Sequence, residues 1–239
     1  MNPRILLVED DPTSRAFLLA ATQALPAEVD AACDMAQAIA LAIVQPHSLW
    51  LFDANLPDGS GTALLQSLRT RGLRTPAVAH TASHDPDEHA ALRAAGFVAT
   101  LAKPLSAQAW AAALRRVLDD GGDANATAEA AAAYSIDAQP PVWNDAKALA
   151  ALGGSAANVA ALRGLFLDEL PASRDAVAQA ARRADSDALR AALHRLQASC
   201  GFVGAERLLT AATRLHAQPG SAAALDAFVD AAQATLSPP

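Results

Sequence analysis

The first 118 residues alternate short apolar or β-branched runs with stretches of helical spacing, and this alternation constrains the fold most strongly. Such a pattern predicts a parallel sheet covered by helices. Helix starts are expected at Pro12, Ser60, Pro86 and Ser106, and helix ends near Gly72 and Gly96. We therefore expect a doubly wound α/β domain at residues 1–118, with five parallel strands at residues 5–8, 29–33, 49–52, 77–80 and 97–101.

The rest of the chain shows a different pattern. Residues 119–141, which read DDGGDANATAEAAAAYSIDAQPP, contain few large apolar residues and predict a linker with a partly helical Ala-rich middle. From residue 142 to 239 apolar residues recur only at helical spacing, which predicts an all-α domain, an antiparallel four-helix bundle. Pro171 is expected to kink or restart one of its helices.

Composition excludes several classes of protein. The net charge is −7 and no run of Lys and Arg is present, so we expect no nucleic-acid binding. Cys33 and Cys200 fall in different predicted domains and are expected to be reduced. The N-terminus turns acidic after a few apolar residues and no later apolar run is long and charge-free, which predicts a cytoplasmic protein without membrane insertion.

Carboxylates follow two of the predicted strands. Glu9 and Asp10 come directly after the first strand, and Asp53 comes directly after the third. The carboxyl ends of such strands meet at the ligand-binding edge of a doubly wound sheet. Close carboxylates repel one another by roughly 1 kcal/mol per pair in water and by about 4 kcal/mol at an effective dielectric near 20. A divalent cation is therefore expected there, and oxygen ligands favour Mg²⁺ or Mn²⁺.

The same edge receives a hydroxyl and an ammonium. Thr81 ends the fourth predicted strand and Lys103 follows the fifth. Together with the carboxylates they predict a phosphoryl-transfer site, in which Asp53 is the nucleophile and Lys103 and the metal neutralise developing charge.

Four segments, ILLVEDDPTSR, LFDANLPDGSG, AHTAS and LAKP, resemble the signature segments of the response-regulator receiver domain, in order and over residues 3–118. The resemblance implies a flavodoxin-like fold and an Asp53 that accepts phosphate from a histidine kinase or phosphotransfer histidine. It implies that Asp10, Asp53 and the Asn55 carbonyl bind Mg²⁺, that Glu9 acts through metal-bound water, and that Thr81 and Lys103 hold phosphoryl oxygens. It also implies a cis Lys103-Pro104 bond.

One position departs from that family. Receivers usually carry Tyr or Phe three residues before the lysine, and this chain has Thr100. Phosphorylation is therefore expected to reshape the last helix face less than usual, or through other residues. His80, the neighbour of Thr81, is expected to border the site, and the remaining histidines outside the predicted bundle helix are expected to be solvated: His47, His84, His89 and His216.

In the predicted bundle, His194 lies one residue away from an apolar stripe formed by Leu189, Leu193, Leu196, Cys200 and Val203. It should be accessible to a partner, with Arg190 one turn before it and Gln197 and Ala198 one turn after it. A neutral imidazole can attack a phosphoryl group at neutral pH. Small neighbours, Ala198 and Gly201, leave room for a partner domain, and Arg190 and Arg195 attract phosphate.

The segment HRLQASCGFVGAERL resembles the signature of the histidine phosphotransfer (HPt) domain, and LGGS and LFLDELP extend the resemblance over residues 143–236. It implies that His194 carries phosphate. The family usually has Leu, Lys and Gly at the second, third and fourth positions after the histidine. This chain keeps Leu196 but has Gln197 and Ala198, so stabilisation of the phosphate is expected to be weaker.

These features favour a phosphorelay in which phosphate reaches Asp53 or His194 and leaves to another protein. A sensor histidine kinase and a further receiver or phosphotransfer protein are the expected partners. The sequence contains no Gly-rich ATP-binding segment. An alternative is a phosphorylation-switched adaptor or phosphate sink in which only Asp53 is active. An aspartate phosphatase is disfavoured, because Asn55 stands where it needs a second carboxylate. The direction of flux and the oligomeric state stay open.

Overall fold

The computed structural model describes residues 2–23, 25–83, 85–103, 105–120 and 140–237. The chain divides into two compact units, residues 1–129 and 130–239. Most of the expected linker, including its Ala-rich middle, lies outside the described residues, as do His84 and Pro104, so the expected cis bond does too.

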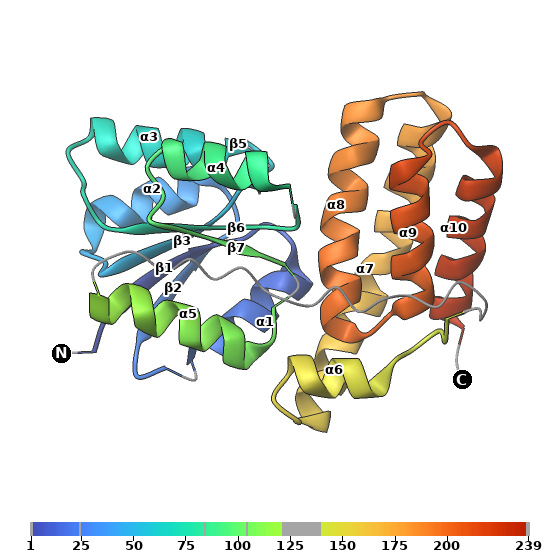
Figure 1. Ribbon diagram of the computed structural model, residues 1–239, viewed down its shortest axis with the longest axis horizontal. Helices are drawn as coiled ribbons and strands as arrows, with labels where there is room; N and C mark the ends of the chain where they lie inside the picture. Colours follow the sequence, from blue (N-terminus) through green and yellow to red (C-terminus); the bar gives the residue numbers. More distant parts are fainter. Residues whose placement is uncertain (1, 24, 84, 104, 121–139, 238–239) are drawn as a thin grey trace. The chain divides into compact units, whose positions relative to one another are not determined.

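A five-stranded parallel sheet forms the centre of the first unit (Figure 1). The strand order is β2-β1-β3-β6-β7, so the order reverses between β1 and β3. The predicted doubly wound sheet is confirmed, with strand ends within two residues of the expected ones. The strands are β1 (Arg4–Val8), β2 (Glu28–Ala32), β3 (Leu49–Asp53), β6 (Ala77–Thr81) and β7 (Ala99–Ala102).

Helices α2, α3 and α4 cover one face of this sheet, and α1 and α5 cover the other (Figure 1). Their starts follow local chemistry: Pro12 and Pro86 open two of them, and Ser60 accepts a hydrogen bond from the Ala63 amide at the start of a third. The helices are α1 (Pro12–Gln23), α2 (Met35–Val44), α3 (Gly61–Thr70), α4 (Pro86–Ala94) and α5 (Ala107–Asp120).

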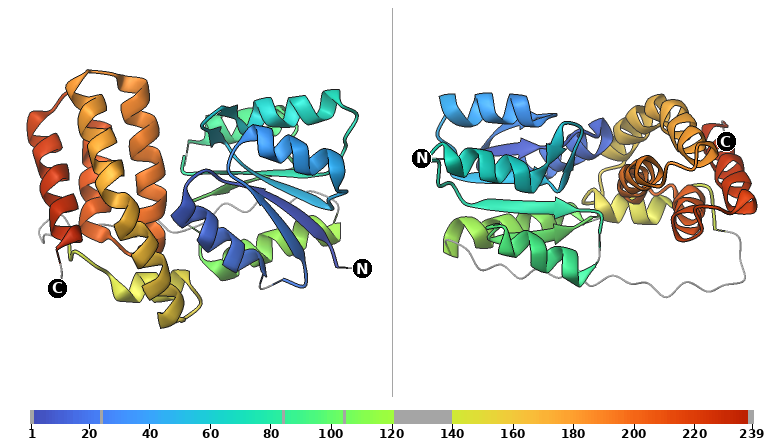
Figure 2. Two further views of the ribbon diagram at one scale, coloured as in Figure 1. Left: turned by 180° about the vertical axis from the view of Figure 1, so that it is seen from behind. Right: turned by 90° about the horizontal axis from the view of Figure 1, so that it is seen from above.

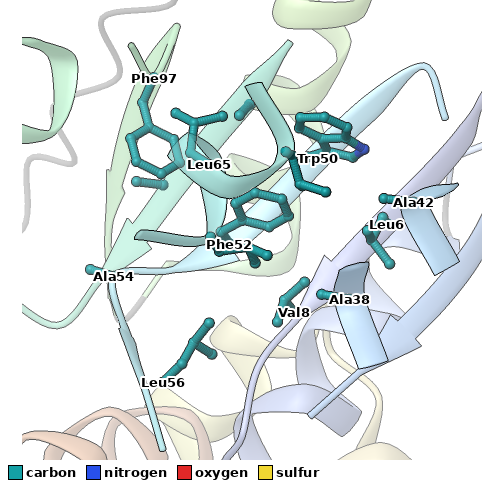
Figure 3. Packing of buried hydrophobic residues seen from close by; sticks show 14 of the residues in the cluster. Leu6, Val8, Ala38, Ala42, Trp50, Phe52, Ala54, Leu56, Leu65 and Phe97 are labelled. Atoms are coloured by element: carbon teal, nitrogen blue, oxygen red, sulfur yellow. The ribbon is translucent and has the colours of Figure 1, made fainter. Parts of the chain in front are cut away.

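Alternate residues of each strand point to opposite faces, and this gives the sheet two apolar layers. On the face of α2 and α3, Phe52 lies between Trp50 and Phe97, with ring centroids 5.7 and 6.4 Å away (Figure 3). On the opposite face His80 meets the Trp110 ring of α5 at 5.7 Å. This packing holds the carboxyl ends of β3 and β6, where the candidate site lies.

A short antiparallel hairpin after β3 was not predicted. It consists of β4 (Asn55–Leu56) and β5 (Gly59–Ser60). Between these strands, the Asp58 carboxylate accepts hydrogen bonds from the Met35 and Ala36 amides at the start of α2. The segment that follows Asp53 is therefore fixed by the N-terminus of a neighbouring helix.

The second unit is the predicted bundle: α7, α8, α9 and α10 contact one another in a closed ring (Figure 2). The apolar residues predicted to pack on α8 are buried. Helix α7 runs unbroken through Pro171, so the helix does not restart there. The helices are α6 (Asp145–Ala151), α7 (Ala156–Arg182), α8 (Ser186–Val203), α9 (Glu206–Ala217) and α10 (Ala222–Leu236).

Gly204 ends α8 in the left-handed region, with φ of 73°. The segment before α6 passes so close that a Cβ at this position would collide with the Asn144 carbonyl, and the Asn144 amide donates to the Gly204 carbonyl at 2.7 Å. Only glycine satisfies both demands without strain.

Within the described residues, no single helix is long and apolar enough to cross a membrane. Helices α6 and α7 pass that test only as a pair, by length and composition, and a bend of 105° separates them.

Candidate functional sites

Two buried carboxylates meet at the carboxyl edge of the sheet. Glu9 follows β1 and is 1% exposed, and Asp53 ends the neighbouring strand β3 and is 5% exposed. Asp10, next to Glu9, is half-buried, and its backbone carbonyl accepts a hydrogen bond from Arg15. The sheet order therefore brings the predicted acidic residues to adjacent strand ends.

Lys103 lies between these two carboxylates. Its Nζ is 2.7 Å from Glu9 Oε2 and 2.7 Å from Asp53 Oδ2. Lys103 follows the edge strand β7, and its amide donates to the Thr81 carbonyl at 2.6 Å, which fixes the backbone from which the ammonium extends. The result is a buried triad with one positive and two negative groups.

The triad sets the protonation states of its members. Burial alone would raise the pKa of Asp53, but Lys103 and the Asn55 amide hold it below its usual value, so the carboxylate is ionised at neutral pH. Burial raises the pKa of Glu9 well above its usual value despite Lys103. Burial would lower the pKa of Lys103, yet the charges of Asp53 and Glu9 raise it. The ammonium therefore stays charged.

Both oxygens of Asp53 have partners. Oδ2 accepts from Lys103, and Oδ1 accepts from the Asn55 amide at 3.0 Å. Asn55 itself is exposed at the start of β4, two residues after Asp53. The turn after β3 and Lys103 thus fix the orientation of the carboxylate.

Thr81 ends β6 and is fully buried. Its hydroxyl donates to Glu88 Oε1 at 3.2 Å and accepts from the Ser83 amide at 3.1 Å. The sequence placed Thr81 at this edge but gave no sign of Glu88, because nothing in the local pattern distinguishes it from an ordinary acidic residue in the first turn of a helix.

His80 belongs to the same cluster. Its Nδ1 is 3.5 Å from Glu9 Oε2, and possible ligand atoms of Glu9, Asp53 and His80 lie within 4.8 Å of one another. Burial and the Lys103 charge lower the pKa of His80 to about 3, so the ring is neutral and its contact with Glu9 is not an ion pair. His80 therefore borders the site, as expected.

The donor set at this edge fits a hard divalent cation. Glu9, Asp10 and Asp53 bring three carboxylates to adjacent strand ends, and Lys103 supplies a single compensating charge. Oxygen-rich sites with excess negative charge are those that bind Mg²⁺ or Mn²⁺.

Two histidines expected to be solvated are not. His47 is buried, with Nε2 2.9 Å from Asp30 Oδ2 of β2. His89 is half-buried, and its ring bonds the Thr100 hydroxyl at 2.8 Å and the Ser83 carbonyl at 2.9 Å. His216 is exposed as expected. Polar partners from distant segments explain both errors.

His194 lies in the middle of α8 and is half-buried. Arg190 and Arg195 are exposed nearby on the same helix. Ala198 and Gly201 follow His194 by four and seven residues, so they share its helical face. The structure thus places a histidine, two cations and two small residues on neighbouring turns.

Gln197 lies one turn after His194 on α8 and contacts a neighbouring helix. Its amide Nε2 is 3.4 Å from the Thr213 hydroxyl of α9, so the side chain reaches across to the neighbouring helix. The sequence could not indicate this partner, because Thr213 is remote along the chain.

Comparisons with known proteins match the two units separately. The model of the response regulator receiver domain matches residues 5–115, and the model of the Hpt domain matches residues 161–237. Sensor histidine kinase GacS of Pseudomonas protegens is 24% identical over 217 residues, which cover 89% of this chain and 24% of the kinase. Sensor protein EvgS of Escherichia coli is 31% identical over 102 residues, which cover 43% of this chain and 8% of that protein.

The chain therefore spans a quarter or less of the length of these two relatives. Among solved structures, the chemotaxis response regulator CheY4 of Vibrio cholerae is 25% identical, with a TM-score of 0.47, over 49% of this chain and all of that one.

Proposed function

We propose that this two-component phosphorelay protein accepts a phosphoryl group on Asp53 and carries one on His194. Residues 5–115 belong to the receiver domain family, and residues 161–237 belong to the Hpt family. The observation that carries the proposal is the Lys103 ammonium 2.7 Å from the nucleophilic carboxylate. Both domains are phosphotransfer modules rather than conventional enzymes.

In the first step an Asp53 oxygen attacks the phosphorus of a phosphohistidine on a donor protein. The P–N bond breaks, its electron pair stays on the donor imidazole, and an acyl phosphate forms on Asp53. The lowered pKa of Asp53 keeps the attacking group ionised. Lys103 offsets charge on the phosphoryl group as the bond forms.

In the second step a neutral imidazole nitrogen of His194 attacks the phosphorus of a phosphoaspartate. The P–O bond to the carboxylate breaks, the carboxylate leaves as an anion, and phosphohistidine forms as the other ring nitrogen releases its proton to water. The exposed Arg190 and Arg195 attract the phosphoryl group electrostatically. The reverse direction uses the same groups.

Mg²⁺, or Mn²⁺, would be held by Asp10, Asp53 and the Asn55 carbonyl, with Glu9 acting through a bound water. When bound, it supplies positive charge that offsets the repulsion between the carboxylates and an incoming phosphoryl group. Three acidic side chains beside a single lysine support this assignment.

We infer that the partners are a sensor histidine kinase and a further receiver or phosphotransfer protein. Two relatives carry the names of a sensor histidine kinase and a sensor protein, and the chain matches a part of each. An Asp acceptor and a His acceptor in one chain suit an intermediate position between two such proteins.

The test is incubation of the full chain with acetyl phosphate and Mg²⁺, followed by mapping of base-labile acyl phosphate and acid-labile phosphohistidine. We expect acyl phosphate on Asp53 and phosphohistidine on His194. Asp53→Asn should lose the acyl phosphate and His194→Gln the phosphohistidine. Asp87→Asn, at an exposed receiver position, and His216→Gln, at an exposed bundle position, are the matched controls and should label like the parent.

Labelling of Asp53→Asn equal to that of the parent would refute the nucleophile. A second outcome would refute the role of His194. If only acyl phosphate forms, and no phosphohistidine appears even when a phosphorylated receiver is added, a phosphorylation-switched adaptor or sink is favoured.

A further inference from the structure

Two adjacent residues of α4 bind the segment that follows β6. Glu88 Oε1 accepts from the Thr81 hydroxyl at 3.2 Å, and His89 Nε2 lies 2.9 Å from the Ser83 carbonyl. Ser83 is therefore bound on both sides, because its amide donates to the Thr81 hydroxyl at 3.1 Å. These bonds form one continuous path from Thr81 to His89.

The path continues into β7. His89 Nδ1 is 2.8 Å from the Thr100 hydroxyl, and Thr100 is 5% exposed. A carbonyl only accepts, so Nε2 carries the hydrogen that bonds Ser83. Nδ1 makes the other hydrogen bond of the ring, with the Thr100 hydroxyl, which can donate or accept. The position where receivers usually have an aromatic ring thus carries a hydroxyl bound to a histidine.

We propose that Glu88 and His89 are positioning residues that couple phosphorylation of Asp53 to β7, with the His89–Thr100 hydrogen bond in place of an aromatic side chain. The inference rests on the proposed function of Asp53. It adds to that function a named route from the phosphorylation site to the surface formed by α4 and β7.

The route follows from the hydrogens available. The Thr81 hydroxyl has one hydrogen, and it is donated to Glu88. A bond from Thr81 to a phosphoryl oxygen requires that hydrogen, so the bond to Glu88 must break. The Ser83 amide donates to the same hydroxyl oxygen, so it follows when the Thr81 side chain swings toward the phosphoryl group, and His89 transmits this movement to Thr100. Coupling through a contiguous network requires two discrete arrangements, and the proposal supplies them as Thr81 bonded to Glu88 or Thr81 bonded to a phosphoryl oxygen.

The first experiment measures hydrogen exchange of residues 97–102 in the full chain, with Mg²⁺ alone and with Mg²⁺ and beryllofluoride, a mimic of the phosphoryl group. In the parent, beryllofluoride should change exchange of β7 amides by about five-fold, the size expected for one hydrogen bond made or lost. Thr100→Val and His89→Leu should each abolish this change, and the double variant should do no more, since both remove the same bond.

Thr100→Ser keeps a hydroxyl and should restore the response. Thr70→Val is the matched control, because that hydroxyl bonds the Gln66 carbonyl within its own helix, and it should respond like the parent. A parent-like response in both Thr100→Val and His89→Leu would overturn the coupling. A parent that takes up neither beryllofluoride nor phosphate would instead overturn the proposed function of Asp53.

The second experiment tests Glu88 by beryllofluoride affinity. Glu88→Ala removes the acceptor that competes for the Thr81 hydroxyl, so affinity should rise about five-fold. Asp87→Ala removes the same charge from the same helical turn, but Asp87 is exposed, and its affinity should change much less. Equal changes in the two variants would show a general effect of charge and overturn the role of Glu88.

Discussion

Lys103 is expected to stabilise the receiver domain as well as to assist phosphoryl transfer. The substitution Lys103→Met removes the ammonium group that the two buried carboxylates share. Ligand atoms of Glu9 and Asp53 lie within 4.8 Å of each other. Two unit charges at that distance repel by about 3 to 4 kcal/mol at an effective dielectric near 20. Removal of one partner of a buried ion pair costs about 3 to 5 kcal/mol. We therefore expect the free energy of unfolding to fall by about 3 to 4 kcal/mol at pH 7 without Mg²⁺.

The loss should shrink as the pH falls. Burial raises the pKa of Glu9 in the folded state. The protonated carboxyl group therefore contributes its full share to the free energy of unfolding below the unfolded pKa of about 4.3. This contribution is lost as the pH rises through the folded pKa. Lys103→Met removes a group that lowers this pKa, which widens the window. The lowered pKa of Asp53 has the opposite effect in the parent, where stability is present above about 3.9 and is lost below it. The stabilities of the two proteins should therefore converge as the pH falls from 7 toward the unfolded pKa of Glu9.

The assay is urea unfolding followed by tryptophan fluorescence in a Trp143→Phe background. The chain has three tryptophans, and the two that remain, Trp50 and Trp110, lie in the receiver domain, so the signal excludes the bundle. Lys147→Met is the matched control, because Lys147 pairs with Glu206 in the bundle and should leave this transition unchanged. A Lys103→Met variant as stable as the parent at pH 7, or a deficit independent of pH, would refute the reasoning.

Three further changes test other parts of the molecule. Gln197→Lys places a cation one turn after His194 and should shift the transfer equilibrium from phosphoaspartate toward phosphohistidine by about two- to five-fold. The shift should be larger at low salt, and the ratio of the two phosphorylated species at two ionic strengths measures it. Thr22→Val leaves the buried indole N–H of Trp110, which donates to Thr22 at 2.8 Å, without its acceptor, and should cost about 1 to 3 kcal/mol in the receiver-specific fluorescence assay. Gly204→Ala introduces a Cβ at a positive φ against a backbone carbonyl and should cost at least about 1 kcal/mol, seen in thermal melts by circular dichroism.

The sheet could be predicted because its strands are short, apolar and bounded by proline, serine and glycine at helix ends. A parallel sheet also fixes where side chains after its strands go, so the meeting of Glu9, Asp53 and Lys103 followed from strand order alone. The hairpin after β3 escaped prediction because two-residue strands carry no periodicity. The hairpin is held by the Asp58 carboxylate, which accepts a hydrogen bond from the Met35 amide at the start of α2, 23 residues earlier in the chain.

The errors at histidines have a common physical origin. His47 and His89 each lie in a polar segment, which indicates exposure, yet both bind partners from other elements. Such pairs depend on the distance between strands and helices after folding and leave no local signal. The same holds for Glu88, which the sequence shows only as a first-turn acid of α4.

The charge balance at the sheet edge links stability to signalling. In the resting state Lys103 divides one positive charge between Glu9 and Asp53. Phosphorylation replaces the single negative charge of the Asp53 carboxylate with a phosphoryl group of about two negative charges. The electrostatic attraction between this group and the Lys103 ammonium is therefore stronger than that of the carboxylate. Glu9 becomes the weaker competitor, because its raised pKa lets it take up a proton more readily than Asp53. On the proposed function, the buried lysine is therefore expected to turn toward the phosphoryl group without leaving Glu9 charged and unpaired. The cation that stabilises the fold would then also stabilise the phosphorylated product.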